Sequence, residues 1–454
     1  MTNPLLPLSK TVVVIGGGFA GLATATALAE AGYQVQVIER RPFLGGRAYS
    51  MRDAKTGDVI DNGQHLMMGC YRETFAFLRR IGSFDLVEFQ NQSRVDFLDR
   101  DSHQTLECPN LPAPLHLLAG LFRLGGISFG DKLRTLRIGG ALRLRNGALE
   151  KKLGHLTVDQ WLSACGQSAL MKERFWEPLT VATLNEALTV APAKLLARVL
   201  QDGFGGTKQD SCMVTSKVGL SELYTEQSKQ FIEARGGKVL VNTAVSKVVI
   251  ESNRFVGIEL AGGERITAES CVSAVPYFAL KKLLPAEVFE TSPFFAGWKD
   301  FQSAPIVSIN VWFDRPVMDL AFAGMIGTRI QWVFNKEVIV KHNPRDLQHL
   351  ALIISAAHDF AKIPKEHLVE LAVEDLRSVL PAAREAKVVH SFVVKEHDAT
   401  LSASPEVEKA RPNPQTPISN FLLAGDWTNT HLPATIEGAV LSGHLCARLV
   451  SGSL

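Results

Sequence analysis

The sequence lacks any large excess of charge of one sign. Its 48 lysine and arginine residues nearly balance its 46 aspartate and glutamate residues, which leaves a formal net charge of +2 at pH 7. A protein that binds nucleic acid usually carries a positive field that attracts phosphates. So small a surplus predicts no nucleic-acid partner.

Cysteine is scarce and unpatterned. The six cysteines lie far apart, with no Cys-x-x-Cys pair among them: Cys70, Cys108, Cys165, Cys212, Cys271 and Cys446. This spacing indicates neither a zinc site nor a disulfide framework. We therefore expect no metal, free thiols and a reducing, cytoplasmic location.

A basic leader and an unbroken membrane-spanning run are missing as well. The first ten residues carry one cation, Lys10, so we expect no signal peptide. Residues 11–29 are uncharged and long enough to span a bilayer, but the glycines at 16–18 interrupt them. We expect a soluble or peripheral protein. Hydrophobic residues make up 46% of the 454 residues, enough for a large core and two or three structural units.

What the sequence does contain, near its N-terminus, is a strand, a glycine-rich loop and a helix. Residues 11–15 are an apolar, β-branched run typical of a buried parallel strand, and residues 19–31 have the composition of a helix. A Gly-x-Gly-x-x-Gly motif joins them; its glycines permit a tight turn, close approach of backbone amides to a pyrophosphate, and helix–strand packing. The expected phosphate site comprises Gly16, Gly18, Phe19, Ala20 and Gly21.

An acidic residue follows at the end of the second predicted strand, residues 35–38. Glu39 lies 18 residues after Gly21, where a carboxylate accepts hydrogen bonds from ribose hydroxyls and disfavours a 2′-phosphate. We expect Arg40 to contribute to the same site. The pattern predicts NAD or FAD rather than NADP.

Two further segments favour FAD over NAD. Gly46 and Arg47 follow the second strand at once, where they can meet the pyrophosphate or the ribityl chain. Near the C-terminus, residues 421–424 predict a buried strand that ends at Gly425 and Asp426, whose carboxylate can bind ribityl hydroxyls. A helix from about residue 434 would then direct free amides at the N1–O2 edge of the flavin. The residues expected at this edge are Thr435, Ile436 and Ala439.

The rest of the chain predicts a second half. Residues 70–210 have a mostly helical composition, and further strands at 305–313 and 350–356 belong to a different sheet. We expect an α/β protein, with a Rossmann-type FAD-binding domain into which a mixed sheet and a helical substrate domain are inserted. The predicted segments are 1–75, 215–285 and 412–454 for the FAD-binding domain, and 76–214 and 286–411 for the substrate-binding domain.

Three stretches are typical of one group of flavoproteins: residues 60–65 with 71–74, residues 176–179 with 182–185, and residues 424–430 with 432–438. In them the chain resembles the bacterial hydroxysqualene dehydroxylases, also called squalene-associated FAD-dependent desaturases. These belong to the amine oxidase and phytoene desaturase superfamily, which the chain resembles over essentially its whole length. The resemblance implies that FADH2 reduces hydroxysqualene, a hydrophobic C30 isoprenoid, to squalene in hopanoid biosynthesis, with an unknown electron donor to FAD. A carotenoid desaturase or amine oxidase of the same fold and a non-catalytic FAD-containing carrier of polyprenyl lipids remain alternatives.

The resemblance also implies roles for single residues. The segment that matches Gly63, Gln64 and His65 lies beside the isoalloxazine in this family, and the strand residue that matches Val245 contacts the adenine side. Asp61 and His65 are the candidates for protonating the substrate hydroxyl, although either could serve only its own loop or the flavin. Residues expected to line the substrate tunnel are Trp176, Asn185 and Trp427, with simple core packing as the alternative for the tryptophans. Some related amine oxidases attach flavin to a C-terminal cysteine, but Cys446 lies deep in the last predicted helix, so we expect non-covalent FAD.

Residues 111–152 combine leucines with an excess of basic residues. Two acids, Asp131 and Glu150, stand against eight cations: Arg123, Lys132, Arg134, Arg137, Arg143, Arg145, Lys151 and Lys152. Such a segment suits an anionic lipid surface, and a C30 hydrocarbon would enter from the bilayer. We expect a peripheral protein on the inner face of the cell membrane, with a solvated helical cap as the alternative.

Overall fold

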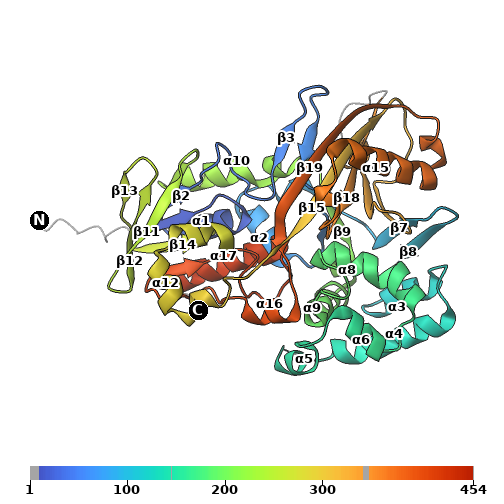
Figure 1. Cartoon of the computed structure of the whole chain (residues 1–454), viewed down its shortest axis with the longest axis horizontal. Coiled ribbons are helices and arrows are strands. Elements are labelled where there is room, and N and C mark those ends of the chain that lie inside the picture. Colours follow the sequence, from blue (N-terminus) through green and yellow to red (C-terminus); the bar gives the residue numbers. More distant parts are fainter. Residues whose placement is uncertain (1–9, 145, 341–346, 453–454) are drawn as a thin grey trace, which may run out of the picture.

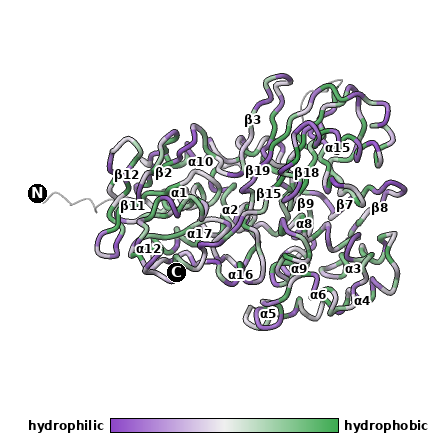
Figure 2. Tube along the Cα trace, viewed as in Figure 1, coloured by the Kyte–Doolittle hydropathy of each residue, from purple (hydrophilic) through white to green (hydrophobic). Residues whose placement is uncertain are grey.

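The computed structural model describes residues 10–144, 146–340 and 347–452. Figure 1 shows an elongated molecule, with one half around α1 and α17 on the left and a second half on the right. In the second half, long strands lie above a lobe of short helices. Figure 2 shows hydrophobic residues along the central strands and hydrophilic residues at outer turns.

A five-stranded parallel sheet forms the centre of the first half. Its order is β10 (Lys238–Leu240), β2 (Gln34–Ile38), β1 (Thr11–Ile15), β14 (Ser270–Ser273) and β20 (Phe421–Leu423). The apolar β1 lies in the middle because a parallel strand is covered on both faces. All five strands come from the three segments predicted for the FAD-binding domain.

Helices from the two ends of the chain pack together on this sheet. They are α1 (Phe19–Glu30) and α17 (Ile436–Ser451), flanked by α10 (Leu220–Glu233) and α2 (Arg72–Arg80). A Cβ on Gly443 would lie 2.3 Å from the carbonyl oxygen of Ala20, so only glycine permits this approach. The Thr24 hydroxyl bonds the Gly443 carbonyl at 3.2 Å. The N-terminal motif and the C-terminal helix are therefore direct neighbours.

A small antiparallel sheet and three short helices flank the first half. The sheet has the order β11 (Val245–Glu251), β12 (Arg254–Leu260) and β13 (Arg265–Ile266). The helices are α11 (Tyr277–Leu283), α12 (Ala286–Thr291) and α13 (Pro293–Ala296).

The second half is built on a seven-stranded mixed sheet. Its order is β19 (Val388–Leu401), β15 (Ser303–Phe313), β18 (Gln348–Ile354), β17 (Trp332–Asn335), β16 (Phe322–Met325), β7 (Arg94–Leu98) and β8 (His103–Glu107). Only the β16–β7 pair is parallel among these strands as described. Helix α15 (Lys365–Val379) covers one face with apolar residues. Strand β17 is followed at once by a single helical turn, α14 (Lys336–Ile339).

The prediction of a mostly helical stretch over residues 70–210 is wrong at β7 and β8. These strands add to the edge of a sheet whose other strands lie about 200 residues or more later in the chain, so tertiary contacts and not local sequence determine their pairing. Two-stranded β3 (Ser50–Arg52) and β4 (Val59–Asp61) and a three-stranded group of β5 (Met67–Met68), β9 (Met213–Ser216) and β6 (Val87–Phe89) join the halves.

The helical lobe contains the remaining long helices. They are α3 (Leu115–Arg123), α4 (Phe129–Leu142), α5 (Asn146–Leu153), α6 (Val158–Ala164), α8 (Glu177–Leu184) and α9 (Ala193–Phe204), with a shorter α7 (Ala169–Met171). They share an apolar core that includes Trp161, Trp176 and Leu196.

Candidate cofactor and active site

The glycine loop between β1 and α1 leaves room for an anion. Gly16 has a φ of +107°, and a Cβ on Gly21 would lie 1.9 Å from the Gly16 carbonyl oxygen. Gly18 begins α1 without a capping side chain, and the first turn of this helix carries no acid. The buried first-turn amides therefore meet no side-chain acceptor among the described residues. This arrangement fits a pyrophosphate at the helix N-terminus.

The carboxylate of Glu39 accepts hydrogen bonds from backbone amides in and next to the glycine loop. Its Oε2 accepts a hydrogen bond from the Gly17 amide at 2.8 Å, and its Oε1 accepts one from the Arg41 amide at 2.9 Å. Each oxygen keeps further acceptor capacity for ribose hydroxyls. The Thr243 amide bonds the Glu39 carbonyl at 2.9 Å, which brings the start of β11, and with it Val245, to this side.

Arg41, which was not among the predicted site residues, fixes the segment around Gly46 beside the glycine loop. Its Nη1 donates to the Gly46 carbonyl at 2.8 Å, whereas the predicted contributor Arg40 is exposed. Gly46 has a φ of +58°, and a Cβ there would lie 3.0 Å from the Cα of Gly18. The two glycine segments are thus in contact. A basic residue directly after Arg40 was the only sequence signal for this role.

Arg47 and Asp426 connect the two distant parts of the site. The Arg47 guanidinium forms an ion pair with the Asp426 carboxylate and also donates to the Ala399 carbonyl at 3.0 Å. Burial opposes the charge of Arg47, but Asp426 and Glu396 outweigh it and raise the pKa of Arg47. Buried Arg411, which sequence reasoning missed, donates to the Asp426 carbonyl at 2.8 Å.

The start of α17 lies beside α2. Thr435 caps α17 by accepting from the Gly438 amide at 3.3 Å, and Ile436 and Ala439 are half-buried in its first turns. The Glu437 carboxylate, another group that was not predicted, accepts from the Thr74 amide at 2.9 Å and the Thr74 hydroxyl at 2.6 Å. Burial raises the pKa of Glu437. Its position in the C-terminal motif was the signal that could have found it.

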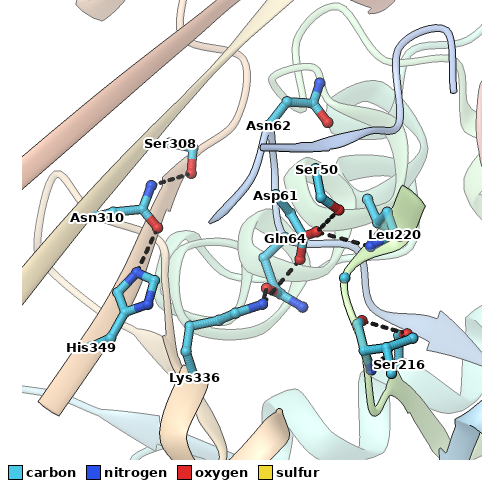
Figure 3. Close-up of polar contacts among 12 residues, drawn as sticks. Ser50, Asp61, Asn62, Gln64, Ser216, Leu220, Ser308, Asn310, Lys336 and His349 are labelled. Atoms are coloured by element: carbon cyan, nitrogen blue, oxygen red, sulfur yellow. Dashed lines mark hydrogen bonds and ion pairs between the residues drawn. The ribbon is translucent and has the colours of Figure 1, made fainter. Parts of the chain in front are cut away.

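Asp61 ends β4 as an acceptor for three donors (Figure 3). Its Oδ1 accepts from the Ser50 hydroxyl at 2.7 Å and the Leu220 amide at 3.0 Å, and its Oδ2 accepts from Lys336 Nζ at 3.0 Å. Burial alone would raise the pKa of Asp61, but Lys336 and these hydrogen bonds lower it. Asp61 is therefore held as a carboxylate.

Lys336 was missed by sequence reasoning. It is the first residue of α14, which Asn335 caps by accepting from the Glu337 amide at 3.2 Å. Its ammonium also donates to Gln64 Oε1 at 2.8 Å. A lysine between the apolar runs of residues 332–334 and 338–340 was a weak sequence signal for a buried, paired cation.

The loop of Gly63, Gln64 and His65 is half-buried and borders open space. A Cβ on Gly63 would meet nothing within 4 Å. Asn62 anchors this loop by donating from Nδ2 to the Arg47 carbonyl at 2.9 Å. Burial lowers the pKa of His65 and Asp61 offsets part of this effect, so the imidazole is neutral near pH 7.

The three predicted tunnel residues have internal partners. Trp176 is 2% exposed and donates to Gln167 Oε1 at 2.8 Å, and Trp427 is 1% exposed and donates to the Val275 carbonyl at 3.1 Å. Asn185 donates to Thr400 Oγ1 at 2.8 Å and accepts from the Ala356 amide at 2.7 Å. These contacts favour structural roles for all three residues. Asn185 in particular links the helical lobe to the large sheet.

The chain matches the model of one protein family over residues 19–451, described as flavin containing amine oxidoreductase. The chain therefore belongs to the flavin-containing amine oxidoreductase family. The cofactor is FAD, and the protein is an FAD-dependent oxidoreductase, as predicted.

Curated relatives narrow the resemblance. The chain is 30% identical to the hydroxysqualene dehydroxylase of Rhodopseudomonas palustris, over 98% of this chain and 99% of the relative. It is 26% identical to that of Zymomonas mobilis, over 96% and 98%. It is also 25% identical to the 15-cis-phytoene desaturase of Synechococcus elongatus, over 97% and 95%. The predicted resemblance to bacterial hydroxysqualene dehydroxylases is confirmed.

Solved structures confirm the amine oxidase-like fold. An oxidoreductase from Methanosarcina mazei superposes with a TM-score of 0.74 at 19% identity, over 96% of this chain and 99% of the other. Putrescine oxidase bound to putrescine superposes with a TM-score of 0.71 at 16% identity, over 98% and 99%.

Proposed function

We propose that the protein reduces hydroxysqualene to squalene in hopanoid biosynthesis. The observation that carries this proposal is the full-length similarity to two proteins named hydroxysqualene dehydroxylase, a name that states the removal of a hydroxyl group from hydroxysqualene. The segment 60–65, part of the motif shared with that group, forms the loop between Arg47 and Lys336. This supports a role for the loop at the reacting end of the cofactor.

The reaction balances with FAD as the only redox partner of the alcohol. The allylic C–O bond breaks, the hydroxyl group leaves with one proton as water, and a C–H bond forms at the same carbon framework. Reduced FAD supplies the hydride for that bond when it is bound. The electron pair lost by the flavin is the pair gained by the hydrocarbon.

The chain's own residues position charge around this step. Asp61, held as a carboxylate by Lys336, Ser50 and Leu220, is a poor proton donor. His65 is uncharged near pH 7 and so a weak acid. The contacts therefore favour charge placement over proton transfer for Asp61, while His65 remains a candidate for a hydrogen bond to the hydroxyl or to the flavin.

The FAD is proposed to be held without a covalent bond. Cys446 is fully buried in α17, and its thiol donates to the Leu423 carbonyl at 3.2 Å. Burial raises the pKa of Cys446, so little thiolate is available for attachment to a flavin.

Anaerobic product analysis tests the proposed reaction. Protein carrying photoreduced FAD is mixed with hydroxysqualene, and the flavin spectrum and extracted lipids are followed together. We expect oxidised flavin and squalene in equal amounts. Oxidation of phytoene by the oxidised protein, with no reaction of hydroxysqualene, would favour the desaturase alternative; lipid binding without flavin oxidation or reduction would favour the carrier.

We further propose that α3 and α4 dock on an anionic bilayer from which the substrate enters. These helices and the segment before α3 carry large exposed apolar side chains, and we name Leu111, Leu115, Phe129, Leu133 and Leu136 the apolar ridge. Phe129 is 67% exposed and Leu115 55%. The α4 members recur at helical spacing on one face, and the exposed Arg123, Arg134 and Arg137 lie on the same helices.

The basic surplus of this region is smaller than the sequence suggested. Lys132 is buried and donates to the carbonyls of Phe122 at 3.0 Å and Leu124 at 2.6 Å. Arg134 pairs with Asp131 at 3.0 Å, and Arg145 lies outside the described residues. Within the described ranges, no helix is long and apolar enough to cross a membrane. The ridge therefore contributes more to docking than charge does, and the proposed location is the inner membrane surface.

A further inference from the structure

Lys336 forms a buried bridge between the two halves of the molecule. It is 4% exposed, it belongs to the large sheet's α14, and its partner Asp61 lies 275 residues earlier in the first half. A buried ammonium is stable only when it is paired and hydrogen-bonded, because burial removes its hydration. An ion pair would meet that need with Asp61 alone, yet Lys336 also bonds Gln64.

The second bond fixes the direction of the Gln64 amide. An ammonium has only N–H donors, so the amide atom that faces it must be the acceptor Oε1. The opposite end of the same amide, Nε2, then points away from Lys336. No acceptor for Nε2 occurs among the residues that the structure describes, and Gln64 is only half-buried. Gln64 therefore offers a hydrogen-bond donor, and at the adjacent Gly63 a Cβ would meet nothing within 4 Å.

An apolar cluster adjoins the loop that carries this donor. Leu66 packs on a cluster that includes Phe334, Ile339 and Ile353 of the large sheet. A long hydrocarbon can lie against such a surface, but the hydrocarbon itself has no hydrogen-bond acceptor for the amide. An alcohol carried by the same hydrocarbon offers one oxygen. Binding sites that hydrogen-bond a hydroxyl discriminate strongly against the ligand that lacks it, because the polar group of the site is then left unpaired.

We propose that Lys336 is a positioning residue that orients the Gln64 amide, and that Gln64 Nε2 donates a hydrogen bond to the hydroxyl oxygen of the bound polyprenyl alcohol. This inference rests on the proposed function and names how the same site tells its substrate from its product. Lys336 makes Gln64 a donor and neutralises Asp61, whose oxygens already accept three hydrogen bonds. The bound hydroxyl therefore meets a donor in Gln64, while the nearby Asp61 carboxylate is already engaged by Lys336 and two further donors.

The test compares the affinities of oxidised, FAD-loaded protein for hydroxysqualene and for squalene, read from changes in the flavin absorbance spectrum. In the unsubstituted protein we expect the alcohol to bind more tightly by about tenfold, the value of one net hydrogen bond. Gln64→Met and Lys336→Met are expected to bring this ratio close to one. Lys362→Met, the same change in the exposed Lys362–Asp359 pair, is the matched control and should leave the ratio unchanged.

A charge-balanced variant separates orientation from stability. Lys336→Met leaves Asp61 buried without its cation, so loss of FAD or of the fold is a possible cause of any defect. Asp61→Asn combined with Lys336→Met removes both charges and should restore FAD content while the affinity ratio stays low. If this double variant regained the full ratio, Lys336 would serve only to neutralise Asp61.

Two other results would overturn the inference. An unchanged ratio in Gln64→Met would show that Gln64 does not recognise the hydroxyl. A shifted flavin reduction potential in Gln64→Met, with the ratio unchanged, would mean that the amide contacts the flavin instead. Failure of the proposed function is distinguishable, because reduced unsubstituted protein would then not react with hydroxysqualene at all.

Discussion

We expect His349 to make the free energy of unfolding of the protein depend on pH. It lies opposite Trp312 in the β15–β18 pair, with the two rings stacked at 4.1 Å and an interplanar angle of 13°. Its Nε2 contacts Asn310 Oδ1 at 2.9 Å, and the residue is 1% exposed. Burial, assisted by the positive charge of Lys336, lowers the pKa of His349 from 6.5 to about 3. The folded protein therefore keeps this imidazole neutral over a range in which the unfolded chain protonates it.

The size of the effect follows from this shift. The pKa of His349 is lower in the folded state than in the unfolded chain. The residue therefore costs no free energy of unfolding above pH 6.5, and the free energy of unfolding decreases progressively as the pH falls from 6.5 toward 3. Each pH unit within that window costs about 1.4 kcal/mol, so lowering the pH to 5 removes about 2 kcal/mol of the free energy of unfolding through this one residue. A variant without a titrating side chain at position 349 should lose about 2 kcal/mol less of its free energy of unfolding over the same change of pH.

Urea unfolding of the FAD-loaded protein at pH 7 and pH 5, followed by tryptophan fluorescence, measures this loss. His349→Gln keeps a donor for Asn310, and its loss of unfolding free energy between the two pH values should be smaller than that of the unsubstituted protein by about 2 kcal/mol. His367→Gln, at an exposed position of α15, is the control and should change nothing. Equal losses in His349→Gln and the unsubstituted protein, or an NMR titration of His349 near pH 6.5, would refute the reasoning.

Three further changes test other parts of the structure. Gly443→Val places side-chain atoms against the Ala20 carbonyl and should lower the unfolding free energy by about 2 kcal/mol or more, together with FAD content measured by absorbance. Asp426→Asn removes the anionic partner of Arg47 and should weaken FAD binding by about tenfold, measured by reconstitution of the apoprotein, whereas unchanged affinity would remove Asp426 from the site. Leu133→Ser with Leu136→Ser should reduce co-sedimentation with phosphatidylglycerol vesicles by about tenfold or more, since each leucine loses its contact with the acyl region. Val389→Ser, at an exposed valine of β19, is the control and should leave co-sedimentation unchanged. Equal vesicle binding by the double leucine variant and the unsubstituted protein would exclude the apolar ridge as the docking surface.

Local pattern was sufficient to predict the cofactor half. The strand at Thr11–Ile15 and the helix from Phe19 lie where the sequence placed them, and the last helix begins two residues later than predicted. Each of these elements carries its own signal, because a buried parallel strand is apolar throughout and a glycine loop separates it from the helix. The meeting of the two chain ends followed from matching both segments to one cofactor.

The contacts that only the fold creates could not be predicted. Lys336 meets Asp61 across 275 residues, and nothing in the sequence around either residue names the other. Likewise, β7 and β8 are strands because β16 provides an edge for them, and Glu437 caps α2 from another helix. Sequence patterns predicted the strands and helices of the segments expected to bind FAD, but the partners of each polar side chain depended on tertiary packing.

The central claim is that this protein transfers a hydride from reduced FAD to the carbon skeleton of hydroxysqualene. A single turnover in D2O tests it directly, since the transferable hydrogen of a reduced flavin exchanges with solvent before it is delivered. We expect squalene that carries one deuterium at the former allylic alcohol unit, formed in proportion to the amount of FAD oxidised. Squalene without deuterium, or oxidised FAD without squalene, would contradict it.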